Sequence, residues 1–337
     1  MKRNYKILNY KEGMEIKKPC IIRGMPNEVY HKMPALSNSG LKTLLDCPAK
    51  YYYKYLSGEY EYKEKPSFKI GKACHMYLLE GRKAFEQVYW HNPYSELKKD
   101  ELIAKLKELG YDDSIKKYLV TDLMELLLDK EGIKPKQIHL TASELNQVVC
   151  MTKNALNDKR AKNALSQKGE PELSIFWQDE KTGVWLKCRP DFLPYDCNIV
   201  PDYKTADSVR PEEFYKSFIK YGYYIQAAMY RMGIKAVTGI DVDSFFFIAQ
   251  EKEPPYITQF YNPRQEDFVT WGEKKIYAAI EKYLECQESG LWNTYSDKII
   301  ELRIEPPPED LLGTYDKEQG IVFAPKWIDN ELLRYEV

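Results

Sequence analysis

The fold is decided by residues 172–205, which read ELSIFWQDEKTGVWLKCRPDFLPYDCNIVPDYKT. Apolar and polar side chains alternate along three parts of this stretch, 172–177, 184–192 and 199–205. A period of two is typical of half-buried strands, and the polar residues, glycine and proline between the parts are typical of turns. The stretch therefore predicts three antiparallel strands joined as a meander, in the sheet of an α/β protein.

The register of these strands brings acidic side chains together. Loops of four residues are common in hairpins, and such loops fit at 180–183 and 195–198. Glu172 then faces Asp191, and Asp191 faces Asp202. Residues that face each other on antiparallel strands point to the same side, with Cβ atoms about 4.5–5.5 Å apart. Three carboxylates are therefore expected in a row across the sheet.

A cation explains such a row. Lys204 follows Asp202 by two residues and shares its side of the strand. Carboxylates set opposite one another are destabilising unless a cation lies between them, and converging carboxylates are ligands for Mg²⁺. We expect a divalent metal site, although a change of one residue in either loop would break the alignment.

These residues also have simpler interpretations. Asp191 follows a proline and can be an acidic residue at a strand end, and Asp202 with Lys204 can be an exposed pair on a strand. His75 lies in a predicted helix and can be a core histidine. The combination at one hairpin favours the metal site over these readings.

Helical patterns surround the predicted strands. A stripe of Tyr223, Gln226 and Tyr230 lies on one helix face, where it serves packing unless it borders a site. Helices are predicted after the cap at 37–40, over 68–79, over 96–130 as a surface pair, from the capping box at 141–144 to about 165, from Pro211 to about 232, and over 265–289. Residues 1–36 predict strands and loops, 243–249 a central strand, and 306–308 the start of a polar tail.

Composition limits the class of protein. The chain has 337 residues, of which 44% are hydrophobic and 30% charged, so one large core is expected. A formal net charge of -1 excludes a global basic field, so any nucleic-acid site must be a local groove. Seven cysteines, none at C-x-x-C spacing, predict free thiols rather than a zinc or iron–sulfur site. No long apolar run or leader stands in the sequence, so a cytoplasmic protein is expected.

Five short motifs follow one another along the chain. They are Gly71-Lys72-Ala73-Cys74-His75, Glu172, Arg189-Pro190-Asp191, Asp202-Tyr203-Lys204-Thr205 and Tyr223-Tyr224-Ile225-Gln226. In this order they resemble the PD-(D/E)xK nuclease superfamily in its RecB-like form. Within that branch the chain is most similar to the C-terminal nuclease domain of RecE (exodeoxyribonuclease VIII). Matching stretches open at Tyr30-His31 and close at Gly290-Leu291-Trp292, so the resemblance covers about residues 28–297.

The resemblance implies a fold and a metal site. It implies a restriction-endonuclease-like core, with a central mixed sheet flanked by helices, as one nuclease domain over 1–300. A helical insertion at about 93–135 interrupts this domain, and 301–337 form a tail. It also implies that His75, Asp191 and Asp202 bind Mg²⁺, or Mn²⁺ in its place, together with the carbonyl oxygen of Tyr203.

The resemblance assigns catalytic roles as well. Lys204 would orient or polarise the attacking water. Glu172 would contact the metal ligands without binding the ion itself, or would bind a second metal ion. Gln226 and Tyr223 would steady Lys204 and the scissile phosphate. Asp202 stands where other members carry glutamate. The insertion is similar to small helix-extended-helix nucleic-acid-binding modules; the alternative interpretation of the insertion is a solvated amphipathic pair of helices.

The implied function is Mg²⁺-dependent digestion of linear double-stranded DNA, 5′ to 3′, leaving a 3′ single strand. The implied partners are DNA ends, a single-strand annealing protein in phage recombination, and further copies of the chain in a ring-like trimer or tetramer. Two alternatives stay open. One is a PD-(D/E)xK endonuclease of a restriction or repair system, and the other is a catalytically silent DNA-binding subunit of the same fold.

Overall fold

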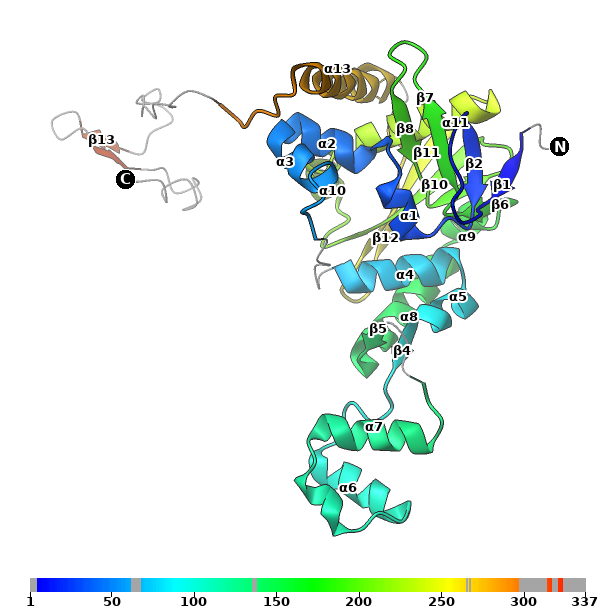
Figure 1. The fold of residues 1–337 in the computed structure, drawn as a ribbon, viewed down its shortest axis with the longest axis vertical. Helices are drawn as coiled ribbons and strands as arrows, with labels where there is room; N and C mark the ends of the chain where they lie inside the picture. Colours follow the sequence, from blue (N-terminus) through cyan, green and yellow to red (C-terminus); the bar gives the residue numbers. More distant parts are fainter. Residues whose placement is uncertain are drawn as a thin grey trace. The chain divides into compact units, whose positions relative to one another are not determined.

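The structure is a computed structural model that describes residues 5–61, 68–134, 138–264, 266, 268–296, 314–316 and 321–323 (Figure 1). The chain forms two compact units, Met1–Trp292 and Asn293–Val337. In the second unit, β13 (Thr314–Asp316) and β14 (Ile321–Phe323) pair antiparallel. Residues 306–308 lie outside the described residues, and the domain boundary near residue 300 stays a prediction.

Two mixed sheets form the centre of the first unit. One has the strand order β1 (Ile7–Asn9), β2 (Cys20–Arg23), β7 (Ser174–Gln178), β8 (Trp185–Cys188) and β3 (Leu36–Ser37). Its two outer pairs are parallel and its two inner pairs antiparallel. The other has the order β10 (Ile199–Ala206), β11 (Ser244–Glu251) and β12 (Thr258–Tyr261). The predicted α/β class with a mixed sheet is confirmed.

The predicted first hairpin is confirmed in its register. β7 and β8 pair with Ile175 opposite Cys188, and the same register continues in the short pair of β6 (Gly169–Pro171) and β9 (Phe192–Pro194). Extended through the break between the two pairs, this register sets Glu172 opposite Asp191, where the Glu172 N–H donates to the Asp191 carbonyl at 3.2 Å.

The predicted pairing of the second and third strands is wrong. β10 pairs parallel with β11, and in the described part of the chain no backbone ladder joins it to β9, although the two strands are in contact. The prolines supply the physical reason. In the predicted register Phe192 would face Pro201 and Pro194 would face Ile199, and proline has no N–H to donate to a ladder.

Helices cover the sheets on both sides. They are α1 (Asn27–Lys32), α2 (Asn38–Asp46), α3 (Pro48–Tyr55), α4 (Lys69–Leu79), α5 (Arg82–Val88), α8 (Ala142–Asn157), α9 (Lys159–Leu165), α10 (Pro211–Lys220), α11 (Tyr223–Thr238) and α13 (Lys274–Ser289), with a π-helical turn η3 (Phe268–Glu273) before α13. α11 lies on β7 and β8, so closely that a Cβ on Gly233 would be 2.6 Å from the Trp177 ring. A second core lies between α4, α8, α9 and the other face of β10 and β11, where Tyr203 and Ile248 are buried. Figure 1 shows α4 and α8 close together beside these strands.

Two predicted long helices are each divided in two. Asp158 ends α8, and its side chain accepts a hydrogen bond from the Arg160 N–H at 2.8 Å to begin α9. Gly222, with φ of 61°, separates α10 from α11. Both breaks follow from local chemistry, because aspartate favours a helix N-cap and glycine adopts the left-handed conformation without strain. The caps at Ser37 and Thr141 are confirmed.

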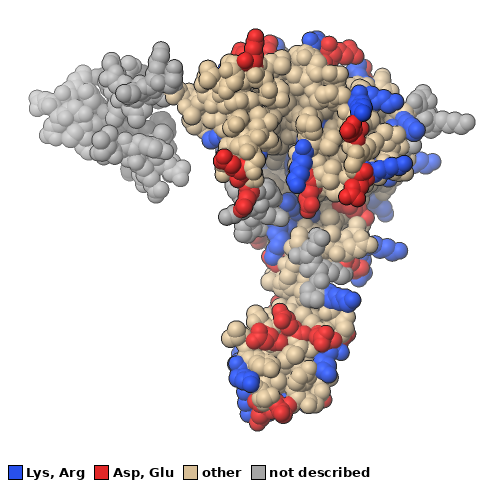
Figure 2. Space-filling model, viewed as in Figure 1, with Lys and Arg blue, Asp and Glu red and all other residues tan. Residues whose placement is uncertain are grey.

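The predicted helical insertion is present between β4 (Tyr89–His91) and β5 (Ile138–Leu140), which pair parallel. It contains α6 (Lys99–Glu108), a 3₁₀ turn η2 (Asp113–Lys117) and α7 (Val120–Lys130). These elements enclose their own apolar cluster, which includes Leu102, Leu106, Ile115, Leu123 and Leu127. Figure 2 shows acidic and basic side chains interspersed on the visible face.

All seven cysteines are free thiols, and five of them are buried. Among the described helices, none combines the length and apolarity needed to cross a bilayer.

Candidate metal centre

The motif Gly71–His75 places a histidine against the sheet. A Cβ on Gly71 would lie 2.8 Å from Thr205 Oγ1 on β10, so a glycine at this position lets α4 approach the strand closely. Ala73 and Cys74 are fully buried, and the Cys74 thiol packs against Met151 of α8. His75 follows Gly71 by one helical turn and shares its face, so the close approach carries the imidazole to the sheet.

Two carboxylates, those of Glu172 and Asp191, lie at the break in the long hairpin, between the β7–β8 pair and the β6–β9 pair. Glu172 has a φ of 53°, a left-handed conformation that costs a non-glycine residue about 1–2 kcal/mol. Arg189 links the two sides of the hairpin, since its guanidinium donates to Ser174 Oγ at 2.8 and 3.0 Å. It also donates to the Met25 carbonyl at 3.0 Å. The strain at Glu172 is therefore held by a fixed neighbourhood, as is common at functional sites.

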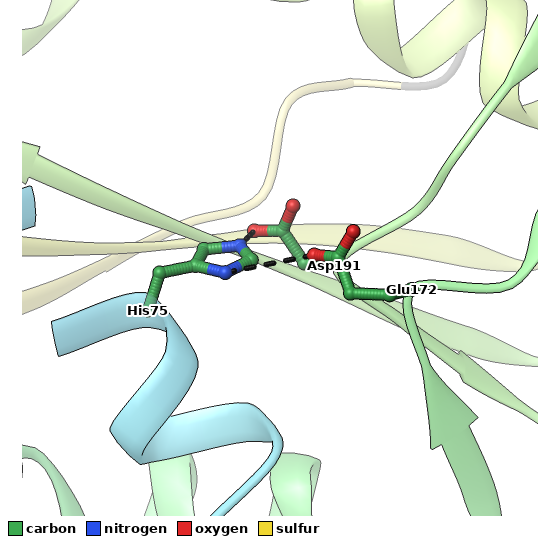
Figure 3. A group of neighbouring side chains, drawn as sticks. All are labelled: His75, Glu172 and Asp191. Atoms are coloured by element: carbon green, nitrogen blue, oxygen red, sulfur yellow. Dashed lines mark ion pairs between the residues drawn. The ribbon is translucent and has the colours of Figure 1, made fainter. Parts of the chain in front are cut away.

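His75, Glu172 and Asp191 meet at this break. His75 Nε2 lies 3.0 Å from Asp191 Oδ2, and His75 Nδ1 lies 3.6 Å from Glu172 Oε1. Figure 3 shows both carboxylates directed at the imidazole, which projects from α4. The Tyr203 N–H also donates to Asp191 Oδ2 at 2.7 Å, which fixes the carboxylate relative to β10.

Asp202 and Lys204 form a second, deeper group beside Asp191. Asp202 is fully buried, and its Oδ2 forms an ion pair with Lys204 Nζ. Its Oδ1 accepts a hydrogen bond from Gln226 Nε2 at 3.0 Å, and the same amide donates to the Tyr230 hydroxyl at 2.9 Å. Lys204 Nζ lies 5.3 Å from the centroid of the Tyr223 ring, a cation–π distance. The stripe on α11 therefore borders the site.

Burial and charge shift the acid–base behaviour of the first group. Burial alone lowers the pKa of His75, but the carboxylates of Asp191 and Glu172 outweigh it and raise the pKa to about 9. Burial raises the pKa of Glu172 to about 7, against the opposing effect of His75. Both side chains therefore carry protons near neutral pH that a bound cation would displace.

The deeper group is shifted by the same causes. Burial and the nearby charge of Asp191 raise the pKa of Asp202 to about 7. Burial also disfavours the charged form of Asp191, but His75 and Lys204 outweigh it and lower its pKa. For Lys204, the carboxylates of Asp202 and Asp191 outweigh burial and raise the pKa. Perturbed groups gathered in one place are typical of a catalytic site.

The donor set fits a divalent cation. One nitrogen of His75 and one oxygen each of Glu172 and Asp191 lie within 4.8 Å of one another. Opposite ligands of a single Mg²⁺ ion are about 4.2 Å apart, since each bond is about 2.1 Å long. Small side-chain movements would therefore place all three around one ion. Carboxylates suit Mg²⁺ and Mn²⁺, and an imidazole favours the transition metal.

The predicted site residues are close together, but not in one ligand cluster. Glu172 joins His75 and Asp191 in the group of three, whereas Asp202 faces Lys204 and Gln226. The metal and catalytic roles of all these residues, including the Tyr203 carbonyl, stay predictions.

Gln250 is a further residue of the site, and it supports Tyr203. This fully buried amide accepts a hydrogen bond from the Tyr203 hydroxyl at 2.6 Å and donates to the Met151 and Tyr256 carbonyls. Its signal in the sequence is a single amide near the end of the apolar run 245–249.

Comparisons with known proteins show the family of the chain and a similar fold. A family profile described as "PDDEXK-like domain of unknown function (DUF3799)" matches residues 37–304. A crystal structure described as a "Putative exonuclease" from Eubacterium rectale is similar in fold, with a TM-score of 0.52 and 14% sequence identity. The match covers 84% of this chain and 97% of the other. No match was found among curated proteins.

Proposed function

Because the chain belongs to the family of PDDEXK-like domains of unknown function (DUF3799), we propose that it is a divalent-metal-dependent nuclease that digests DNA from an end. The observation that carries the proposal is the arrangement around Asp191. Its carboxylate lies 3.0 Å from His75 and interacts electrostatically with the buried Asp202–Lys204 pair, so candidate metal ligands and a cation lie close together.

Phosphodiester hydrolysis requires an activated water and positive charge beside the phosphate. A bound Mg²⁺ or Mn²⁺ supplies a water with a lowered pKa and counter-charge for the phosphoryl oxygens. His75, Glu172 and Asp191 are the residues that would hold it, with Asp202 next to them. The protein contributes the positions of these groups rather than covalent chemistry.

Lys204 acts on the attacking water and the phosphate. Its ammonium is held by Asp202 and lies over the Tyr223 ring, so it occupies one place with its charge retained. From there it orients the water by a hydrogen bond and stabilises negative charge on the phosphate. Gln226 keeps Asp202 in position, and Tyr230 keeps the Gln226 amide in position.

The finer part of the proposal follows the resemblance to RecE-like nucleases. We propose digestion of linear double-stranded DNA from 5′ to 3′, which leaves a 3′ single strand for an annealing partner in recombination. A ring-like oligomer would confine positive surface to a channel, which suits a chain with a net charge near zero.

The experiment compares linear and covalently closed circular DNA with the full chain in Mg²⁺ or Mn²⁺. We expect the linear form to be digested and the closed circle to be spared, and Asp191→Asn to be inactive. Rapid nicking of the circle would support an endonuclease instead. Wild-type binding of DNA without any digestion would support a silent subunit. Linear DNA labelled at either end reports polarity, and light scattering reports the size of the oligomer.

A further inference from the structure

Lys42 on α2 is fixed at the break between α10 and α11. Its Nζ donates a hydrogen bond to the carbonyl oxygen of Tyr221, the last residue before the break, at 2.7 Å. Its stem crosses Gly222, where an added Cβ would lie 3.0 Å from Lys42 Cδ. The left-handed glycine therefore both turns the chain and leaves room for the lysine, so the side chain is held in one place.

Among the residues that the structure describes, no acidic group pairs with the charge of Lys42. In the described residues its hydrogen-bond partner is a neutral carbonyl and no carboxylate forms an ion pair with it, so two of its three N–H groups remain for another acceptor. Burial, with a smaller effect from the nearby charge of Lys204, lowers its pKa to about 8. A half-buried cation close to a second cation does not stabilise a fold, but it suits a site that receives an anion.

Tyr221 places an exposed aromatic ring next to Tyr223 of the metal centre. Its side chain is 50% exposed, and its ring lies 5.9 Å from the ring of Tyr223, which in turn lies under Lys204. Lys220 Nζ lies 5.7 Å from the Tyr221 ring. Two rings and flanking ammonium groups therefore lead outward from the site. Exposed aromatic rings beside cations are the elements that bind nucleic-acid strands, because every base can stack and every phosphate is anionic.

We propose that Lys42 and Tyr221 form a subsite for the nucleic-acid strand next to the scissile phosphate. Lys42 binds a backbone phosphate, and Tyr221 stacks on a base of the same strand. This subsite rests on the proposed nuclease function and adds to it the contacts that seat the substrate.

Binding measured without digestion tests the subsite. The full-length protein is titrated into a fluorescein-labelled duplex with a single-stranded end, in EDTA and at several salt concentrations. We expect Lys42→Met to reduce the slope of log K against log[salt] by about 0.7–0.9, the value for one lost phosphate contact. We expect Tyr221→Ala to weaken binding roughly 5- to 150-fold, as for one lost stacking contact, and Tyr221→Phe to bind like the wild type.

Two controls separate this role from a structural one. Lys216→Ala changes a lysine on α10 that pairs with Glu213, and we expect its binding to be unchanged. We expect the melting temperature of Lys42→Met to equal or exceed that of the wild type, because the change removes an unpaired, half-buried charge. A marked fall in melting temperature would make Lys42 a structural residue and overturn the inference.

The remaining outcomes distinguish the subsite from the function on which it rests. Wild-type digestion of DNA, combined with wild-type binding by both Lys42→Met and Tyr221→Ala, would overturn the subsite alone. If the wild-type protein neither bound nor digested DNA, both proposals would fail.

Discussion

Replacing Gly71 with alanine should move His75 away from Asp191. The new Cβ would lie 2.8 Å from Thr205 Oγ1, whereas ordinary contacts begin at 3.4 Å; because the β-branched threonine is stiff, we expect α4 to retreat by up to 3.4 − 2.8 = 0.6 Å. The distance between His75 Nε2 and Asp191 Oδ2 is 3.0 Å, and a retreat of this size takes it beyond hydrogen-bond range. Metal ligands tolerate only about 0.2 Å.

The expected result is a loss of activity without a loss of stability. A misplacement of about 1 Å costs about 100-fold in rate, so we expect kcat/KM on linear DNA to fall roughly 10- to 100-fold. The melting temperature should not fall in proportion, because alanine favours a helix over glycine by about 1 kcal/mol.

Changes at Thr205 provide the control. Thr205→Ala removes the atom that the new Cβ would meet, so the double variant Gly71→Ala/Thr205→Ala should regain activity. Thr205→Val keeps the size and the stiff β-branched shape, so it should not rescue. Full activity of Gly71→Ala, or equal rescue by alanine and valine, would refute the argument that close approach of α4 positions His75.

Three further predictions concern the metal, the lysine and the insertion. Mn²⁺ affinity should rise as the pH rises from about 6 to 9, because His75 (pKa about 9) and Glu172 (pKa about 7) are protonated below these values and must lose their protons when the ion binds. Calorimetry in two buffers of different ionisation enthalpy measures this proton release. An affinity that does not depend on pH would contradict the prediction. Lys204→Met should lower the digestion rate at least roughly 100-fold while Mn²⁺ still binds, since the lysine acts on water and phosphate rather than on the ion; a wild-type rate would remove its catalytic role. Replacing residues 93–134 with a flexible linker of about eight residues should leave a cooperative unfolding transition of the remaining protein, because the insertion has its own apolar cluster. Loss of that transition would show that the core depends on the insertion.

The local parts of the fold were predictable from the sequence. The hairpin register that sets Glu172 opposite Asp191 follows from alternation and one turn, both of which are local. The caps at Ser37 and Thr141 follow from residue type. The shared side of Asp202 and Lys204 follows from the period of two in a strand, whatever the strand pairs with.

Pairing between distant strands was not predictable in the same way. β10 joins β11, which begins 38 residues after the end of β10, counted from Ala206 to Ser244, and no local pattern selects that partner over β9. The prolines at 194 and 201 disfavour the pairing of β10 with β9, but a prediction based on alternation alone does not take prolines into account. Asp202 lies on β10, which pairs with β11 rather than continuing a meander from β9, so it lies beside the cluster of His75, Glu172 and Asp191 and not in line with it.

The position of His75 was predictable only through the resemblance. Spacing placed the residue on a helix, but the approach of α4 to β10 depends on the contact between Gly71 and Thr205, which lie 134 residues apart, counted from 71 to 205. Such long-range contacts leave no periodic trace in the sequence. Lys42 and Gln250 were missed for the same reason.

Anomalous scattering from crystals grown with millimolar Mn²⁺ locates the bound ion directly. We expect one peak enclosed by His75, Glu172 and Asp191, with Asp202 and Lys204 beside it. Absence of a peak there, or a peak held by other residues, would contradict the assignment of this cluster as the metal centre of a nuclease.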